Sequence, residues 1–584
     1  MASNSVDKKD EHLYRMRHTA AHVLAQAVLE IFPTAGLAIG PPIEDGFYYD
    51  FDLPRSLTPE DLQEIELHMR GIVDADLPLV YAEKSRGEAR EYLEALHQAY
   101  KVELVDDLPE GETISFYTQG TFTDLCRGPH VESTGRIGAF KLDKIAGAYW
   151  RGDEHRPMLQ RIYGVLFETE DELNAYYERL EEAKKRDHKV LGKQLGLFAN
   201  SSIVGPGLPL WLPKGATIRR ILERWITDVE LDSGYQHVYT PIMAKTELYK
   251  QSGHLAHYID SMFPIMKVEN EEFVLRPMNC PHHIQVFKVD SHSYRDLPVR
   301  IAELASQFRF EKSGELSGLS RVRAMTLNDA HIFCTEDQVI EEVKSCVRMV
   351  QAAYAKLGLT DFRFRLSLHD PDNKEKYVDN PELWERAEGE LRQVFHELDV
   401  PYYEGVGEAA FYGPKIDIQL RNFLGKEETV STVQVDRHLP NQFDLEYVGE
   451  DGQYHRPVMI HRGVISTMER MVSYLIEHYA GAFPVWLAPV QAIILPIADR
   501  HHEYAQDVAA RFKKAGLRVE VDARNEKLGK KIAEGNAQKI PYMLVVGDRD
   551  AAAGNVSVRK RAEGDLGALS VDDMIARLTA EAQG

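Results

Sequence analysis

Cysteine and histidine residues in the middle of the chain offer metal ligands from three separate segments. Cys280, His282 and His283 lie in RPMNCPHH, His331 in NDAHIF and His461 in VMIHRG. One thiol and two imidazoles form a typical zinc donor set that leaves a fourth position open for substrate. Lone histidines are more often polar groups satisfied within a core, so the spacing alone leaves both interpretations open.

The segment that contains His331 also carries charged side chains on one face of a predicted strand. Strand alternation over RVRAMTLNDAHIF (321–333) places six side chains on one face: Arg321, Arg323, Met325, Leu327, Asp329 and His331. Isolated charges are costly in a packed core, so this face is expected to line a polar site, or else to be a solvated sheet face with surface ion pairs. Upstream, Arg309 and Glu311 of FRFE share a face, and a guanidinium suits bidentate capture of phosphate.

A third motif, HRGVISTMERM, combines a strand with a helix. We expect the strand to end at His461-Arg462, Gly463 to break it, and a helix to begin there. Helix N-termini attract anions, and Arg470, about two turns into the helix, is expected to point back toward the same site.

The N-terminal region holds a second cluster. HTAAH places His18 and His22 one helical turn apart on one face, and DLCRGPH adds Asp124, Cys126 and His130. The spacing of these residues is typical of a metal site, but the spacing alone leaves that interpretation open.

Length and composition limit the classes of protein that could carry these sites. The chain has 584 residues, 44% hydrophobic residues and a net charge of −23, which excludes global disorder and argues against a histone-like DNA binder. Four scattered cysteines fit a reduced, cytoplasmic compartment. The sequence has no run of about 18 consecutive apolar residues, so no membrane-spanning helix is expected.

The pattern along the chain predicts a multidomain α/β protein with four segments. Residues 1–170 read as a mixed α+β unit, and residues 171–199 as a charged linker helix. Residues 200–483 alternate as antiparallel strands with helices between them. Residues 484–584 have short apolar strands and a helix typical of βαβ units. Their cluster Arg559-Lys560-Arg561 fits either a polyanion partner or a basic edge strand.

Taken together, these motifs resemble class II aminoacyl-tRNA synthetases and, in detail, the threonyl-tRNA synthetase family. Motif 1, the dimerisation element of that class, resembles KGATIRRILERWITDVELDSG followed by YQHVYTP. Motif 2 resembles FRFE with the downstream RVR, and motif 3 resembles the strand and helix that contain MERM. RPMNCPHH, NDAHIF, YGPKIDIQL, HTAAH, DLCRGPH and GAYWRGD are similar to further signatures of that family. The resemblance extends from about His12 to the end of the chain.

The resemblance implies an editing domain (1–170), a linker helix (171–199), an antiparallel class II catalytic domain (200–483) and an α/β anticodon-binding domain (484–584). It implies ATP-dependent activation of L-threonine, transfer to tRNA(Thr) and hydrolysis of mischarged seryl-tRNA. The implied partners are tRNA(Thr), ATP with Mg²⁺, L-threonine and a second copy of the chain as homodimer, with no membrane and no DNA. The form is one without a small extra domain ahead of the editing domain.

The resemblance also implies roles in the catalytic domain. One Zn²⁺ per subunit would be held by Cys280, His331 and His461, its open position receiving the amine and hydroxyl of threonine. Residues that would contact bound threonine are Asp329, Tyr412 and Gln434. The remaining positions matching functional residues are Arg309 (α-phosphate), Glu311 (near adenine), Arg470 (γ-phosphate), Arg323 and Lys415 (substrate or phosphate) and His254 (transfer step, unless it is an ordinary loop histidine).

The sequence departs from the family at the adenine and pocket walls. Met325 stands where an aromatic residue is usual, Leu327-Asn328 replace a more polar pair, and 429–436 replace a segment that usually carries Trp-Gln-Cys. The zinc ligands, both phosphate arginines and Asp329 are intact, so an active enzyme is expected. The alternatives are a non-catalytic tRNA-binding relative and a synthetase for another amino acid such as proline or serine.

The N-terminal cluster has a chemical rationale within this resemblance. Serine lacks only one methyl group of threonine, a difference worth about 1–3 kcal/mol, so a second hydrolytic site is expected. The editing residues implied are His18, His22, Asp124, Cys126 and His130, acting without a metal, with Lys101 and Tyr49 nearby. Asn525, Asp550 and Arg559 match anticodon-reading positions, although ordinary polar surface residues would look the same.

Overall fold

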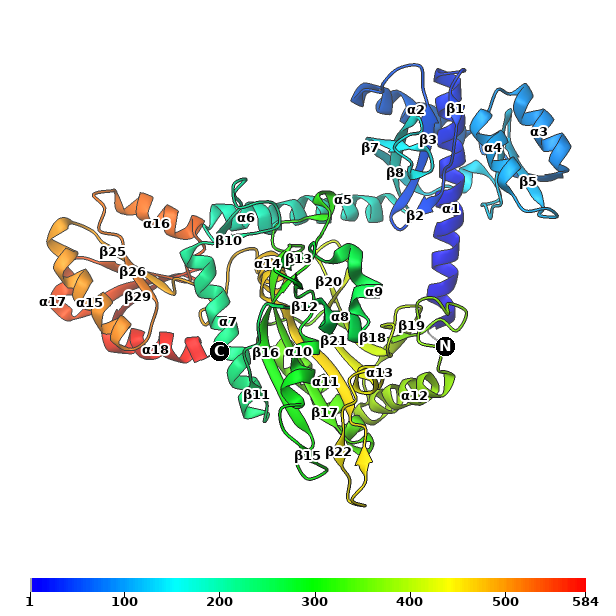
Figure 1. The fold of residues 1–584 in the computed structure, drawn as a ribbon. Coiled ribbons are helices and arrows are strands. Elements are labelled where there is room, and N and C mark those ends of the chain that lie inside the picture. Colours follow the sequence, from blue (N-terminus) through cyan, green and yellow to red (C-terminus); the bar gives the residue numbers. More distant parts are fainter. Residues whose placement is uncertain (1–2, 584) are drawn as a thin grey trace. The chain divides into compact units, whose positions relative to one another are not determined.

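The structure, a computed structural model, describes residues 3–583 and divides between Glu181 and Glu182 into two compact units. No helix among the described residues is long and apolar enough to cross a membrane. Each unit has its own hydrophobic core and is described by itself (Figure 1).

The N-terminal unit packs the long helix α1 (Ser3–Ile31) against an antiparallel sheet. Small and aliphatic residues make close packing possible on the buried face of α1, where Ala20, Leu24 and Ala27 are fully buried. The sheet has the strand order β1 (Gly36–Leu37), β3 (Gly46–Asp52), β8 (Met158–Phe167) and β7 (Ala139–Tyr149), with β2 (Pro42–Ile43) paired to β3.

A smaller sheet in the same unit has the order β4 (Val80–Lys84), β5 (Ile114–Gln119) and β6 (Phe122–Leu125). Helices α2 (Pro59–Asp74), α3 (Arg86–Ala95) and α4 (Ala99–Asp107) complete the unit. Strand β6 ends immediately before Cys126, so the end of the small sheet brings this thiol toward α1.

The predicted linker helix consists of two helices, α5 (Glu170–Arg186) and α6 (His188–Gln194). The break falls at Asp187, whose carboxylate accepts a hydrogen bond from the backbone of Lys189 and caps α6. A capping carboxylate satisfies a backbone donor that would otherwise lack a partner, which explains why the helix restarts there.

An eight-stranded, mainly antiparallel sheet forms the centre of the second unit (Figure 1). Only the two outer pairs, β11 with β16 and β18 with β19, are parallel. The strands, in spatial order, are β11 (Gln236–His237), β16 (Val299–Phe308), β17 (Ala324–Cys334), β24 (Val458–Thr467), β21 (Glu427–Asp436), β20 (Lys415–Arg421), β18 (Phe362–Leu368) and β19 (Tyr402–Val406).

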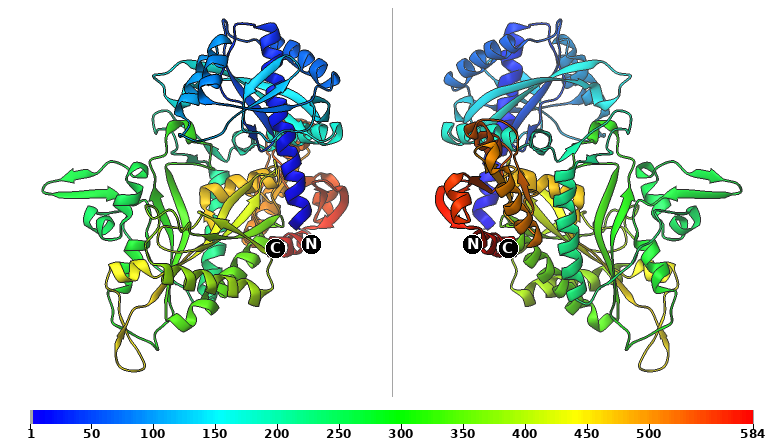
Figure 2. Two further views of the ribbon diagram at one scale, coloured as in Figure 1. Left: turned by 90° about the vertical axis from the view of Figure 1, so that its right-hand side faces the viewer. Right: turned by 90° about the vertical axis from the view of Figure 1, so that its left-hand side faces the viewer.

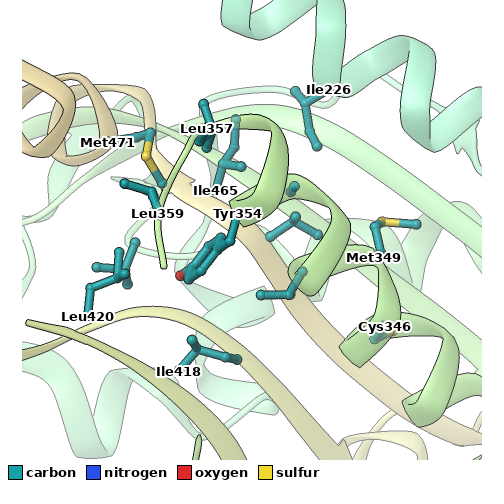
Figure 3. Packing of buried hydrophobic residues seen from close by; sticks show 14 of the residues in the cluster. Ile226, Cys346, Met349, Tyr354, Leu357, Leu359, Ile418, Leu420, Ile465 and Met471 are labelled. Atoms are coloured by element: carbon teal, nitrogen blue, oxygen red, sulfur yellow. The ribbon is translucent and has the colours of Figure 1, made fainter. Parts of the chain in front are cut away.

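Helices bury one face of this sheet. Figure 3 shows α11 (Val339–Lys356) laid over the strands, with Tyr354 among Ile418, Leu420 and Ile465. The hydroxyl of Tyr354 lies 2.7 Å from Ser431 Oγ, so the polar end of this buried ring has a partner. Further helices of this unit are α7 (Pro213–Asp232), α12 (Pro381–Leu398) and α14 (Met468–His478).

The strand expected to end at Arg462 in fact continues through Gly463 to Thr467. Gly463 stays in the ladder because it pairs with Asp329 on one side and with Thr432 on the other. Helix α14 therefore begins at Met468, and Arg470 lies in its first turn rather than two turns into it. The backbone of Arg470 donates to Thr467 Oγ1, the cap of the helix.

A small sheet, β12 (Met243–Lys245), β14 (Glu271–Leu275) and β13 (Met266–Val268), stands out from the large sheet in both views of Figure 2. It is followed by α10 (Cys280–Phe287), which begins at the cysteine of RPMNCPHH.

The C-terminal region forms a five-stranded sheet of its own. Its order is β26 (Val519–Val521), β25 (Ala492–Pro496), β27 (Tyr542–Val546), β28 (Asn555–Lys560) and β29 (Gly564–Ser570), the first three strands being parallel. Strand β28 is inside the sheet, so the basic cluster does not mark an edge strand. Arg561 donates to the carbonyl oxygens of Ala482 and Phe483 and is engaged within the fold.

A fully buried ion pair connects α7 to the centre of the large sheet. Arg462 Nη1 lies 2.6 Å from Glu230 Oε1, and both side chains are completely buried. Asn328 Nδ2 donates to the same oxygen. Breaking such a pair strands one charge in a medium of low dielectric constant.

We predict that Arg462→Leu destabilises the second unit by about 3–5 kcal/mol because Glu230 loses its charge partner. The matched control is Arg363→Leu, which breaks the partly exposed pair with Glu427 and should cost less than about 1 kcal/mol. Urea unfolding followed by circular dichroism measures both losses, and equal losses would contradict the role assigned to the buried pair.

Candidate active site

A cavity of about 650 Å³ opens on the sheet face opposite to the covering helices, lined by strands β16, β17, β20, β21 and β24 and by α14. The cavity gathers predicted residues from distant segments. Those that line it are Cys280, Arg309, Glu311, Asp329, His331, Tyr412, Lys415, Gln434, His461 and Arg470.

One end of the cavity holds the Cys/His cluster. Cys280 is the first residue of α10, and His331 and His461 face each other across the β17–β24 pair with ring centroids 4.7 Å apart. The ligand atoms of the three residues lie within 4.8 Å of one another. A thiol and two imidazoles at these separations fit a zinc ion with one open position facing the cavity.

Burial sets the protonation of Cys280 and His331. It raises the pKa of the Cys280 thiol well above its ordinary value and lowers the pKa of His331 well below its own. A neutral imidazole is the form that binds metal, and a cation would take the place of the thiol proton. The residues present therefore fit zinc chemically as well as geometrically.

The two neighbouring histidines of RPMNCPHH lie elsewhere. His283 is fully buried beside His331, with 2.8 Å between the Nδ1 atoms of the two rings. His282 is buried as well, but it does not belong to the group of ligand atoms formed by Cys280, His331 and His461. The sequence offered both residues as ligands, and only the three-dimensional structure separates them from Cys280.

Sequence reasoning missed Asp436 and Glu303. Asp436 Oδ2 lies 2.9 Å from His461 Nε2, and Glu303 Oε2 lies 3.2 Å from His283 Nε2. Burial acts to raise the pKa of Glu303, but hydrogen bonds from His283, Arg276 and Thr240 outweigh it and lower the pKa to about 2. The sequence signal that could have indicated Glu303 and Asp436 is an acidic residue beside an apolar residue within a strand.

Three predicted threonine-binding residues surround the metal end. Asp329 lies on β17 with its Oδ2 atom 3.9 Å from His331 Nε2, and burial raises its pKa to about 6. The Tyr412 ring stacks on His461 at 5.2 Å, and its hydroxyl donates to the amide oxygen of Gln434. A carboxylate, a hydroxyl and an amide beside an open metal position can hold a small molecule with an amine and a hydroxyl.

The other end of the cavity carries positive charge. Among residues 3–583, the side-chain hydrogen bonds of Arg309 and Arg470 go to carbonyl and amide oxygens and not to carboxylates. Arg309 contacts Pro277 O and Gln307 Oε1 at long distances, and Arg470 donates to the carbonyl oxygens of Ser320 and Thr429. Guanidinium groups without a counterion, half-buried in a cavity, are suited to bind phosphate.

Two further candidates, Lys415 and Arg323, take different positions. Lys415 lines the cavity but its Nζ atom pairs with Asp417 at 2.6 Å. Arg323 is not part of the lining: its Nε and Nη2 atoms donate to the carbonyl oxygen of Glu311, and its guanidinium lies over Phe310. It holds the chain segment that carries Glu311.

His254 is fully buried, at the start of α9 (His254–Tyr258), and is therefore not a surface loop histidine. Its Nδ1 atom lies 2.8 Å from Ser252 Oγ and its Nε2 atom 3.6 Å from Cys280 Sγ. Burial lowers the pKa of His254 to about 4, so the ring is neutral beside the metal cluster.

The N-terminal cluster also assembles. Cys126 Sγ lies 3.2 Å from both His18 Nε2 and His130 Nε2, and His22 lies beside them on α1. All four ligand atoms fall within 4.8 Å of one another. Burial raises the pKa of the Cys126 thiol to about 12 and lowers the pKa of all three imidazoles, so the cluster is uncharged.

Asp124 anchors the wall of this second site. Lys101 Nζ lies 2.7 Å from Asp124 Oδ1, and the hydroxyl of Tyr49 donates to Asp124 Oδ2 at 2.6 Å. His22 Nε2 is 4.0 Å from the same oxygen. Lys101 and Tyr49, which the resemblance implied to be near this site, lie next to the histidines and the cysteine.

The three anticodon candidates are spread over the C-terminal sheet. Asn525 is exposed after β26, and Asp550 lies in α17 (Asp548–Ala553) after β27. Asp550 already accepts hydrogen bonds from Gly547 N and Ser557 Oγ. Arg559 pairs with Met543 near the beginning of β27, so it lies away from the strand ends that carry the other two.

Comparison with known proteins agrees with this architecture. The class II core domain of tRNA synthetases (G, H, P, S and T) matches residues 263–479, an anticodon binding domain matches 491–581, and the threonyl and alanyl tRNA synthetase second additional domain matches 114–163. A threonine–tRNA ligase of Halalkalibacterium halodurans is 56% identical over 99% of this chain and 90% of that protein. Threonine–tRNA ligase 1 of Bacillus subtilis is 55% identical over 98% of this chain and 89% of that protein.

A solved structure is also similar. The crystal structure described as the RNA binding domain of threonyl-tRNA synthetase from Cryptosporidium parvum is 37% identical, with a TM-score of 0.65. The match covers 68% of this chain and 98% of that one.

An antiparallel sheet with unpaired arginines at one end of its cavity, together with the matched core domain, defines a class II aminoacyl-tRNA synthetase. Identity above one half over nearly the whole length of the relatives is more specific. The chain belongs to the threonyl-tRNA synthetase family.

We predict that Arg309→Gln lowers threonine-dependent ATP–pyrophosphate exchange by about 100- to 1,000-fold, since it removes a preorganised charge from the phosphate end of the cavity. Arg323→Gln should cost far less, because its guanidinium faces Phe310 rather than the cavity. The exchange rate at saturating threonine separates the two variants. An equally inactive Arg323→Gln would show that this side chain also reaches substrate.

Proposed function

We propose that this chain is a threonine–tRNA ligase with a separate editing site. It joins L-threonine and ATP to threonyl-adenylate and pyrophosphate, then transfers the threonyl group to the 3′ end of tRNA(Thr) with release of AMP. The observation that carries the proposal is the Cys280/His331/His461 cluster at one end of a cavity whose other end holds unpaired Arg309 and Arg470.

The metal end supplies selection for the amino acid. Cys280, His331 and His461 would hold the zinc, which as a Lewis acid would bind the amine and hydroxyl of threonine. Asp329 would accept hydrogen bonds from the amine, and Tyr412 with Gln434 would close the pocket around the small side chain. Valine has no hydroxyl, so it would leave these buried polar groups unsatisfied and be rejected.

The arginine end supplies stabilisation of charge. In the first step the carboxylate oxygen of threonine attacks the α-phosphorus of ATP, and the bond to pyrophosphate breaks. Arg309 is assigned to the α-phosphate and Arg470 to the γ-phosphate, with Mg²⁺ accompanying the nucleotide. Glu311 is assigned to the adenine side, Lys415 and Arg323 to support of the nucleotide pocket, and His254 to the transfer step.

The N-terminal cluster is proposed to hydrolyse seryl-tRNA(Thr). His18, His22, Cys126 and His130 would position the ester and a water molecule without a resident metal, and Asp124 with Lys101 would hold the aminoacyl end. What supports this assignment is that the cluster is neutral and lies beside a charged pair that can bind an ammonium group and a hydroxyl.

The remaining assignments follow the same resemblance. Editing is assigned to residues 1–170, linkage to 171–199, catalysis to 200–483, and anticodon binding through Asn525, Asp550 and Arg559 to 484–584. The enzyme is placed in the cytoplasm. A homodimer is supported by apolar side chains left exposed at the end of α7 and after β11, where Tyr239 is 96% exposed alongside Leu231, Ile242 and Met243.

Replacing Cys280 by Ser tests the catalytic site. We expect wild-type protein to carry about one zinc per chain and to charge tRNA(Thr) with threonine, and Cys280→Ser to lose both, because a serine hydroxyl is a poor zinc ligand. Metal analysis and ATP–pyrophosphate exchange provide the measurements. Two zinc ions per wild-type chain would contradict the metal-free editing site, and full activation by a zinc-free variant would contradict the threonine pocket.

Replacing His18 by Ala tests the editing site. The variant is expected to charge threonine at the wild-type rate but to accumulate seryl-tRNA(Thr), since modest discrimination against serine in the catalytic site is no longer corrected. Charging with each amino acid, followed by deacylation of preformed seryl-tRNA, measures this. Unchanged clearance of seryl-tRNA would remove His18 from the editing mechanism.

A further inference from the structure

His331 contacts a buried histidine that is not a metal ligand. His331 Nδ1 lies 2.8 Å from His283 Nδ1, and the two rings are nearly perpendicular with centroids 4.8 Å apart. Both side chains are almost completely buried. Two neutral imidazole nitrogens at this distance form a hydrogen bond only if one carries the hydrogen and the other is the acceptor.

Glu303 decides which ring donates. Its Oε2 atom lies 3.2 Å from His283 Nε2, while Arg276 Nη2 and the Thr240 hydroxyl donate to the carboxylate at 3.0 and 2.7 Å. An ionised carboxylate only accepts hydrogen bonds, so His283 Nε2 carries the hydrogen. The amide nitrogen of Asn279 is also 3.2 Å from His283 Nε2, but a charge-assisted bond is roughly twice as strong as a neutral one and prevails.

The position of the hydrogen on His283 determines the position of the hydrogen on His331, which belongs to the metal cluster. With its hydrogen on Nε2, neutral His283 has a lone pair on Nδ1 and accepts a hydrogen bond from His331 Nδ1. His331 Nε2 then keeps its own lone pair, and this nitrogen faces the cavity, 3.9 Å from Asp329 Oδ2. The hydrogen bond made by one ring nitrogen thereby sets which nitrogen of His331 binds metal.

His461 is oriented by a direct contact with a carboxylate, without an intervening histidine. Asp436 Oδ2 lies directly against His461 Nε2 at 2.9 Å, which leaves Nδ1 toward the cluster. The two metal-binding imidazoles therefore use opposite ring nitrogens. One is set by a carboxylate directly and the other by a carboxylate through an intervening histidine.

We propose that His283 is a positioning residue of the metal site. Its hydrogen bond to Glu303 leaves its Nδ1 atom as the acceptor for His331 Nδ1, and this fixes His331 Nε2 as the metal ligand. The proposal rests on the zinc site of the proposed function. Outer hydrogen-bond partners of this kind typically contribute about 10- to 100-fold to metal affinity. The arginine end of the cavity has no part in this chain of contacts.

Two amide variants separate the two contacts of His283. The amide of Asn occupies the place of the imidazole Nδ1 atom, so His283→Asn keeps an acceptor for His331 and loses the contact with Glu303. The amide of Gln reaches the place of Nε2, so His283→Gln keeps the contact with Glu303 and loses the one with His331. Both replacements are polar and of similar size, so their effects on folding are matched.

The experiment measures the zinc affinity of the full-length chain by competition with a chromophoric chelator. We expect His283→Gln to weaken zinc binding by about 10- to 100-fold and His283→Asn to retain most of the affinity. His282→Gln, in the neighbouring position of α10 and outside the cluster, serves as the control with unchanged affinity. At saturating zinc, His283→Gln should raise the KM for threonine and leave the KM for ATP unchanged.

Equal zinc affinities of His283→Gln and wild type would overturn the proposal, as would equal losses in the Gln and Asn variants, which indicate a general packing effect. A wild-type chain that binds no zinc would overturn the metal site itself. The cobalt(II) form adds a readout independent of activity: its visible ligand-field bands should change in His283→Gln and not in His283→Asn.

Discussion

The pairing of β17 with β24 is the constraint on which the catalytic unit depends. In this register His331 lies opposite His461, and Asp329 lies opposite Gly463. Side chains alternate along a strand, so a slip of one residue would turn every one of these groups into the helix-covered core. The buried pair of Arg462 with Glu230 lies on the same strand and connects it to α7. A slip would therefore also strand two charges, and the register is specified from both faces of the sheet.

The cavity above this pairing is electrostatically divided. At one end, burial keeps the imidazole of His331 neutral and the thiol of Cys280 protonated until a cation replaces the proton. At the other end, the hydrogen bonds that Arg309 and Arg470 make within the described part of the chain go to neutral oxygen atoms, so their charge remains available to an anionic ligand. The same sheet face thus presents neutral groups suited to bind a metal at one end and positive charge at the other. The N-terminal unit uses similar residues in a different electrostatic setting. Its histidines and cysteine lie beside the Lys101–Asp124 ion pair, whose two charges balance each other.

Sequence patterns predicted the antiparallel sheet, the parallel C-terminal strands and most cavity residues, because alternation and motif spacing are local properties of the chain. They failed where tertiary contacts override local signals. Gly463 reads as a strand terminator, yet hydrogen bonding to two neighbouring strands keeps it extended, and the helix begins five residues later at Met468. The charged segment 171–199 reads as one helix, yet Asp187 caps a second one. Arg323 shares the alternation of the cavity residues but precedes the strand, and its guanidinium packs on Phe310.

The sequence by itself determined which chemical groups are present and in which motifs they occur: a thiol and imidazoles for a metal, guanidinium groups for phosphate, and the HTAAH and DLCRGPH clusters. It could not rank the consecutive residues His282 and His283, because both are equally suited in type and spacing to bind metal. Only the tertiary structure decided that His282 lies outside the metal cluster, that His283 lies between Glu303 and His331, and that Asp436 lies against His461. The physical reason is that a hydrogen bond depends on atoms brought within about 3 Å by strands far apart in the chain, and no local pattern encodes that distance.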